Sequence, residues 1–350
     1  MLSSINNEKK YKILLTTEKK GCKLTMFLIL TKGKQMKDGV YFGLDEGIYH
    51  SLDRLSASGM KDILESPTKF WFNSVFNPLR EEKKTDAMDA GTMFHAYVLE
   101  GEKAFNEKYV VMPTEIEMLN KNSSAFKLWK AGQTKKVVSW QKFFDMKKII
   151  RYLEMDGQIL STPFLKGGWP EVSILWTDER GIARKARIDY LRECSFVDLK
   201  TFATDKIGEI ESYIAKYFFT YKVYIQLVNY REALRAACNF KPEQIHGTKE
   251  QKAFFKKVQK NEDFLPFVLF INRNLPQARI KTFTKENCGD LWLLAENKIE
   301  KACDIFCQNL QKYGKNSAWM EEPDIDNLNF VDADFPQSFF EILNNRGSYE

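Results

Sequence analysis

The sequence predicts a mixed α/β fold of the α+β type, in which helices flank a small central sheet. The segment 171–202 alternates apolar and polar residues as β-strands do, and helical patterns lie on both sides of it. The chain has 350 residues, of which 44% are hydrophobic and 29% charged. This is the composition of a globular protein, and the length suits one large domain with extensions or two small domains.

Charge divides the chain into three parts. The leader, residues 1–38, holds nine lysines against three acidic residues and shows neither clear periodicity nor a convincing helix cap, so we expect it to be poorly ordered. Residues 39–320 form the folded domain, with a net charge of +7, and residues 321–350 form an acidic tail of −7. The whole-chain charge of +6 therefore says little about a nucleic-acid partner, because only the charge of the folded domain bears on one.

Composition also excludes several classes of protein. No run approaches the roughly 18 apolar residues of a membrane span, so we expect a cytoplasmic protein with no membrane partner. The six cysteines form no Cys-x-x-Cys pair, and there are only three histidines, which leaves structural zinc without ligands at suitable spacing. We expect the cysteines to be free thiols.

The expected helices begin soon after residue 49. Ser58 is predicted to cap one short helix, and Ser66 to cap a second with Pro67 at its first position. A third helix is expected over 86–99, followed by a mixed helical and basic region over 102–157.

The strand pattern predicts a three-stranded antiparallel unit and, later, two more strands. The expected elements are strands at 171–177, 182–191 and 195–202, a long helix at 209–238, a lysine-rich connector at 241–260, strands at 267–272 and 278–284, and a helix at 286–311. Helices thus precede, interrupt and follow the strands, which is the order of a mixed α/β domain.

Three charged residues fall on two neighbouring predicted strands. Asp198 and Lys200 are two apart on one strand, so they face the same way, and Asp189 on the preceding antiparallel strand can lie beside them. Two carboxylates and an ammonium group suit phosphodiester hydrolysis, because hard oxygen ligands hold Mg²⁺ and a cation offsets the developing negative charge.

An ordinary salt-bridged hairpin would contain the same three residues. Apolar neighbours favour the functional interpretation, because Val197 and Leu199 flank Asp198 and their strand positions look buried. A charge in such a place needs a partner or a metal ion.

At this point the sequence resembles the PD-(D/E)XK nuclease superfamily, and within it the RecB-like and RecE-like (exonuclease VIII) exonucleases of phage recombination modules. RIDYL with Asp189, VDLKT with Asp198 and Lys200, QLVNY with Gln226 and Tyr230, and GTMFHAYVLEG with Gly91 and His95 are similar to the family motifs. LSASGMKDILESPTKF is similar to the opening of the RecE-like subgroup, so the resemblance covers roughly residues 45–312. It implies a restriction-endonuclease-like core for the domain at 39–320.

The resemblance also implies a metal centre. His95, Asp189, Asp198 and the carbonyl of Leu199 would hold Mg²⁺, with Mn²⁺ able to substitute. Lys200 would orient the attacking water and stabilise the transition state. For His95 taken alone, a core histidine remains the alternative.

Further residues could surround this centre. Gln226 and Tyr230 could contact a phosphate or brace the metal site, or could simply lie on a helix face with one buried tyrosine. Glu171 is either an additional acidic group near the metal or a plain strand-end carboxylate. The basic residues on the strand leading into Asp189 could touch an incoming phosphate; these are Arg184, Lys185 and Arg187.

The implied activity is that of a metal-dependent DNA exonuclease, acting on double-stranded DNA with free ends in phage-type recombination or end processing. A single-strand annealing protein is the expected partner and a homo-oligomeric ring the expected assembly. No Gly-x-x-x-x-Gly-Lys-Ser/Thr sequence occurs, so we expect no nucleotide cofactor. Cys288, Cys303 and Cys307 depart from the spacing of cluster-binding relatives, so we expect no iron–sulfur cluster.

Two alternatives remain open from the sequence. One is a structure-specific or nicking endonuclease with the same metal site, because the fold does not decide where a strand is cut. The other is a non-catalytic DNA-binding module of the same fold, against which the intact Asp189, Asp198 and Lys200 argue.

Overall fold

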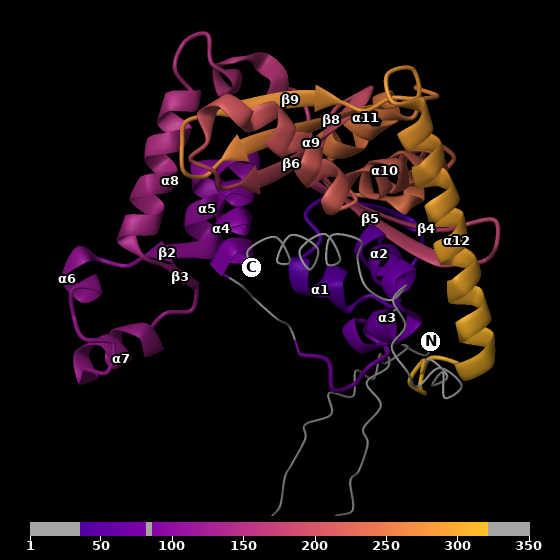
Figure 1. Cartoon of the computed structure of the whole chain (residues 1–350), viewed down its shortest axis with the longest axis horizontal. Helices are drawn as coiled ribbons and strands as arrows, with labels where there is room; N and C mark the ends of the chain where they lie inside the picture. Colours follow the sequence, from indigo (N-terminus) through magenta and orange to yellow (C-terminus); the bar gives the residue numbers. More distant parts are fainter. Residues whose placement is uncertain (1–35, 82–85, 321–350) are drawn as a thin grey trace, which may run out of the picture.

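A seven-stranded sheet forms the centre of the computed structural model, which describes residues 36–81 and 86–320 (Figure 1). The strand order is β7-β1-β4-β5-β6-β8-β9. The pairs β1–β7 and β6–β8 are parallel, and the other pairs are antiparallel. The strands are β1 Gly39–Tyr41, β4 Trp169–Thr177, β5 Ala183–Leu191, β6 Ser195–Phe202, β7 Ile245–His246, β8 Leu265–Asn272 and β9 Ala278–Thr282.

Helices cover both faces of the sheet because each face carries its own apolar cluster. The larger cluster joins one face to α2 Ala57–Glu65, α3 Pro67–Asn73, α9 Ile210–Thr220, α10 Val223–Cys238, α11 Lys249–Val258 and α12 Gly289–Tyr313. The smaller cluster joins the other face to α4 Asp86–His95, the π-helix η1 Ala96–Glu100, α5 Gly101–Lys108 and α8 Trp140–Leu153. The helix α1 Glu46–Ser51 precedes both sets.

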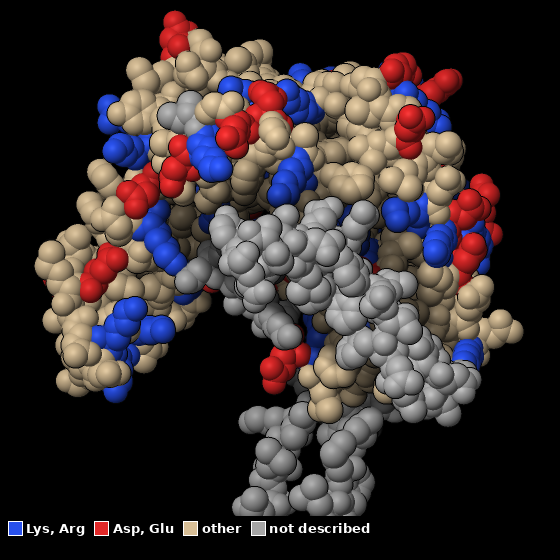
Figure 2. All heavy atoms as spheres, in the orientation of Figure 1, with Lys and Arg blue, Asp and Glu red and all other residues tan. Residues whose placement is uncertain are grey.

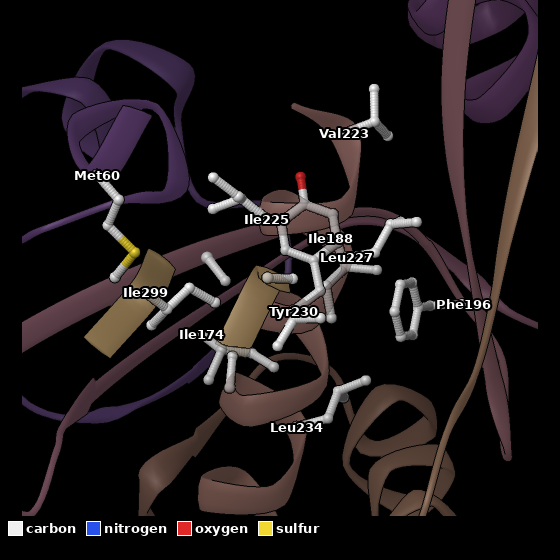
Figure 3. Packing of buried hydrophobic residues seen from close by; sticks show 14 of the residues in the cluster. Met60, Ile174, Ile188, Phe196, Val223, Ile225, Leu227, Tyr230, Leu234 and Ile299 are labelled. Atoms are coloured by element: carbon white, nitrogen blue, oxygen red, sulfur yellow. The ribbon is translucent and has the colours of Figure 1, made fainter. Parts of the chain in front are cut away.

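Strand β6 shows how the sequence directs side chains to the two layers. Phe196 belongs to the larger cluster, whereas Val197 and Leu199 belong to the smaller one. Because side chains alternate along a strand, Asp198 and Lys200 face the same layer as Phe196, toward α10. Figure 3 shows this layer, with Phe196 of β6 and Ile174 of β4 packed around the apolar side chains of α10.

The described structure confirms the predicted three-stranded antiparallel unit, β4–β5–β6, and both later strands. It adds strands that the sequence pattern did not predict: β1, β7, and a parallel pair in the region 102–157, made of β2 Tyr109–Val111 and β3 Lys136–Val138. Each of these has only two or three residues, too few to establish an alternation.

The structure corrects three local predictions. Ser56, rather than Ser58, caps α2 by accepting from the backbone N–H of Gly59. The lysine-rich connector at 241–260 contains α11, whose apolar face buries two phenylalanines. The long helix expected at 209–238 is interrupted at Lys222, whose φ of 50° is left-handed and ends one helix before the next begins.

Other predictions are confirmed or fall outside the described residues. Ser66 caps α3 with Pro67 at its first position, and a helix does follow at 86–99, although its last turn is the π-helix η1. The leader up to residue 35 and the acidic tail at 321–350 are outside the described residues. In the part of the chain that is described, none of the helices has both the length and the apolar character needed to cross a bilayer.

An arm, residues 112–135, projects from the body between β2 and β3 (Figure 1). It carries the short helices α6 Thr114–Glu117 and α7 Ser124–Ala131. Short 3₁₀ turns complete the fold elsewhere: η2 Ile159–Ser161, η3 Pro163–Leu165, η4 Ile207–Glu209 and η5 Pro242–Gln244. The sheet and its two helical layers form the body of the protein, from which the arm projects.

The packing predicts a stability difference between two apolar truncations. Phe270 of β8 is fully buried in the larger cluster, so Phe270→Ala should lower the free energy of unfolding by about 3–5 kcal/mol. Leu128 on α7 is 78% exposed, so Leu128→Ala should change it by less than about 0.5 kcal/mol. Urea denaturation followed by circular dichroism measures both, and equal effects would contradict the assigned core.

Candidate metal and active site

The candidate site opens where strands β5 and β6 part. Their ladder contains only the pairs Tyr190 with Val197 and Leu191 with Phe196, next to the turn. Beyond it, the Asp189 carboxylate accepts a hydrogen bond from the backbone N–H of Leu199 at 2.8 Å. The side chain thus takes the place of a backbone acceptor, which fixes the carboxylate between the two strands and satisfies a buried donor.

His95 reaches this carboxylate from the opposite layer, at the end of α4. Its Nδ1 lies 3.6 Å from Asp189 Oδ2, too far for a hydrogen bond. Gly91 allows α4 to pack closely against β6, because a Cβ at this position would lie 3.3 Å from Thr201 Oγ1. The π-helix η1 follows directly, and π turns occur frequently at functional sites.

Glu171 completes a group of three possible metal ligands. Ligand atoms of His95, Glu171 and Asp189 all lie within 4.8 Å of one another. The backbone of Glu171 has a φ of 52°, a left-handed conformation that glutamate rarely adopts and that lies inside β4 rather than at its start. Its carboxylate lies 3.4 Å from Arg187 Nε, which holds it beside the cluster.

Asp198 and Lys200 lie next to this group, on the α10 side. Lys200 Nζ lies 2.9 Å from each carboxylate oxygen of Asp198, and the contact to Oδ1 is a hydrogen bond. Gln226 of α10 also donates to Oδ1 at 2.9 Å. Asp198 has no exposed surface, and its Oδ2 has no hydrogen-bond donor in the described structure despite its contact with the ammonium group.

Gln226 and Tyr230 support the site in different ways. The Gln226 amide lies 2.6 Å from the Tyr230 hydroxyl, and this contact orients the amide toward Asp198. The Tyr230 ring is 6% exposed and packs among aliphatic side chains in Figure 3. Tyr230 is therefore a core residue whose hydroxyl positions Gln226.

Burial controls the protonation of these groups. It raises the pKa of Glu171 to about 8, helped by the charge of Asp189, and raises that of Asp198 to about 6 against the opposing effect of Lys200. Burial lowers the pKa of His95 to about 4, and the Lys200 ammonium adds to this shift. His95 is thus neutral at pH 7 and can serve as a metal ligand. The raised pKa values of Glu171 and Asp198 mean that the nearby positive charges do not offset the effect of burial on these carboxylates.

The donor set fits a divalent metal ion. One neutral imidazole and several carboxylate oxygens are suitable ligands for Mg²⁺ or Mn²⁺, and Asp198 Oδ2 is a buried acceptor without a donor. Of the predicted ligands, His95 and Asp189 come together directly with Glu171, and Asp198 lies beside them. The backbone of Leu199 also lies at the site, where its N–H donates to Asp189.

The structure places two of the three predicted DNA-contacting residues inside the fold. Arg184 is 5% exposed and binds Asn229 and Glu232 of α10. The Lys185 ammonium group donates to the backbone carbonyls of Tyr49 and Leu52. Both side chains are engaged within the fold rather than directed to an incoming phosphate, because β5 is an interior strand of the sheet.

Arg187 is held by groups around Glu171. It donates to Ser173 and to the backbone carbonyl of Leu44, and its guanidinium lies 4.9 Å from the centre of the Tyr49 ring. Tyr49 is thus a neighbour of the site that sequence reasoning missed, because α1 is short and carries no motif. Lys61 of α2 and Tyr217 of α9 also interact electrostatically with Lys200.

The residues of the site lie within a region that matches a known protein family. A family model described as "PDDEXK-like domain of unknown function (DUF3799)" matches residues 56–287, which is more than half of the chain. A crystal structure described as "Putative exonuclease", from Eubacterium rectale, is similar at 16% sequence identity over 83% of this chain and 92% of that chain, with a TM-score of 0.44. No curated protein matches the sequence.

The raised pKa of Glu171 predicts that the stability of the fold depends on pH and that a bound metal ion offsets this dependence. Because the pKa of Glu171 is raised from 4.5 to about 8, the folded state binds more protons than the unfolded state in that range, so stability without metal should fall as pH rises through it. Saturating Mn²⁺ should raise the Tm by roughly 5 °C near the upper end of the range and by less near the lower end.

Substitution identifies the source of this effect in scanning calorimetry with EDTA or Mn²⁺. Glu171→Gln should flatten the metal-free pH profile and reduce the response to Mn²⁺. Glu262→Gln, at an exposed carboxylate, should leave both unchanged. An unchanged Mn²⁺ response in the Glu171 variant would exclude it as a ligand.

Proposed function

Because this chain belongs to the PD-(D/E)XK nuclease family, with its PDDEXK-like domain over residues 56–287, we propose that it is a metal-dependent exonuclease that hydrolyses linear double-stranded DNA. The observation that carries the proposal is the meeting of His95, Glu171 and Asp189 with the Asp198–Lys200 pair at the opening between β5 and β6. A salt-bridged hairpin would not need a third carboxylate and an imidazole from the other helical layer.

The residues divide the chemistry between them. When bound, Mg²⁺ or Mn²⁺ would supply Lewis-acid activation of a phosphate oxygen and of water. Lys200 holds a positive charge beside Asp198, where it can orient the attacking water and offset charge on the transition state. Gln226 keeps Asp198 in place, and Arg187 does the same for Glu171.

Surface charge supports a localised rather than a global attraction for DNA. Figure 2 shows Lys and Arg mixed with Asp and Glu over the visible face, with basic side chains also on the arm. The arm holds four lysines against two glutamates, so it is mildly basic. A duplex approaching the site would therefore be held mainly by contacts near the metal ligands and by scattered lysines.

The proposal extends to biological context. A RecE-like role in phage-type recombination or end processing would leave a single strand for an annealing protein, and a homo-oligomeric ring would retain the DNA. Both expectations rest on the motif resemblance in QLVNY and LSASGMKDILESPTKF. Light scattering of the purified full chain tests the assembly directly.

Digestion of end-labelled linear DNA tests the proposed activity. The wild type should release nucleotides with Mg²⁺ or Mn²⁺ and none with EDTA, while Asp198→Ala and Lys200→Ala should each slow digestion by about 100-fold or more. Lys256→Ala, an exposed lysine on α11, is the matched control and should digest at the wild-type rate. Wild-type rates in both site variants would disprove the assigned site.

A covalently closed circle distinguishes the proposed activity from its main alternative. An exonuclease needs an end and should leave the circle intact, whereas a nicking or structure-specific endonuclease should relax or linearise it. Cleavage of the circle that depends on Asp198 would keep the metal site and replace the exonuclease assignment.

A further inference from the structure

Helix α2 presents a lysine to the Asp198–Lys200 pair. The helix packs against α10, and its Glu65 binds Lys222, the residue just before α10, at 2.8 Å. Lys61 lies four residues before Glu65, so both share the helix face toward the start of α10, where Gln226 contacts Asp198. The strongest electrostatic neighbours of Lys61 are Lys200 and Asp198.

Among the described residues, the charges around Lys61 are paired, whereas Lys61 has no partner. Lys200 binds Asp198, while Lys222 and Lys69 both bind Glu65. Within residues 36–81 and 86–320, no side-chain or backbone acceptor forms a hydrogen bond or ion pair with Lys61, although its side chain is only partly exposed. Burial lowers the pKa of Lys61 to about 8, and the like charge of Lys200 adds to the shift.

Two ammonium groups beside the single Asp198 carboxylate leave positive charge that a further anion could balance. Lys200 lies 2.9 Å from both oxygens of Asp198, and Oδ1 also accepts from Gln226, so the charge of this carboxylate is already balanced by one ammonium group. An unpaired, partly buried ammonium group is unfavourable unless a ligand brings an acceptor. A phosphate oxygen would provide the missing negative charge to Lys61 while remaining close to Lys200.

We propose that Lys61 binds a backbone phosphate of the DNA strand that is being cut, on the Lys200 side of the site. This inference rests on the proposed nuclease function and adds a substrate-contacting residue to it. The strongest charged neighbours of Lys61 are Lys200 and Asp198, and an ammonium group does not bind a metal ion, so its role would be to hold the strand.

Equilibrium binding without hydrolysis tests the assignment. Fluorescence anisotropy with a short blunt-ended duplex in EDTA is measured over a range of salt for the wild type, Lys61→Met and Lys61→Arg. Lys61→Met should weaken binding roughly tenfold at low salt and reduce the salt-dependence slope by about one ion. Lys61→Arg keeps the charge and should restore most of the affinity.

Controls separate this role from a structural one. Lys256→Met, at an exposed lysine on α11, should bind as the wild type does, and Lys61→Met should keep the wild-type Tm. Unchanged affinity and slope in Lys61→Met, or failure of Lys61→Arg to restore binding, would overturn the inference while leaving the nuclease proposal intact. A wild-type protein that neither binds nor digests DNA would overturn both.

Discussion

The hydrogen bond from the Leu199 backbone to the Asp189 carboxylate is the interaction on which the site depends. It occurs where the β5–β6 ladder stops, so the sheet opens without leaving a buried N–H unsatisfied. The opening lets His95 approach from one helical layer while Gln226 approaches Asp198 from the other. A continuous ladder would have closed the space in which these groups meet.

The electrostatics of the site run against the stability of the fold. Of three carboxylates, Asp189 and Asp198 are buried and Glu171 is half-buried, and burial raises the pKa of each. Among the described residues, Arg187 contacts Glu171 and Lys200 contacts Asp198 as balancing cations. Glu171 also holds a left-handed backbone conformation. The two apolar clusters on either side of the sheet must maintain this arrangement, as is common where function requires unfavourable local geometry.

The sequence predicted those parts that are long and periodic or that carry adjacent charges. Asp198 and Lys200 were placed together because strand alternation is strict, and Asp189 because its hairpin turn was recognisable. The full role of Glu171 could not be predicted, since its position depends on a backbone conformation that no residue type signals. The interior position of Arg184 was equally hidden, because only the tertiary contact with α10 shows that β5 is covered. The short strands β1 and β7 exist only through pairing with distant segments.

The π turn after His95 has a consequence for how freely this chain can vary. A π turn has more residues than an α-helical turn, so it changes the angle between the residues before it and those after it. His95 ends α4 before the turn, whereas the buried residues Ala96, Tyr97 and Leu99 lie within η1. Deleting one residue within the turn would restore regular α-helix and rotate the buried residues of η1 relative to His95. The length of this turn is therefore more constrained than its composition.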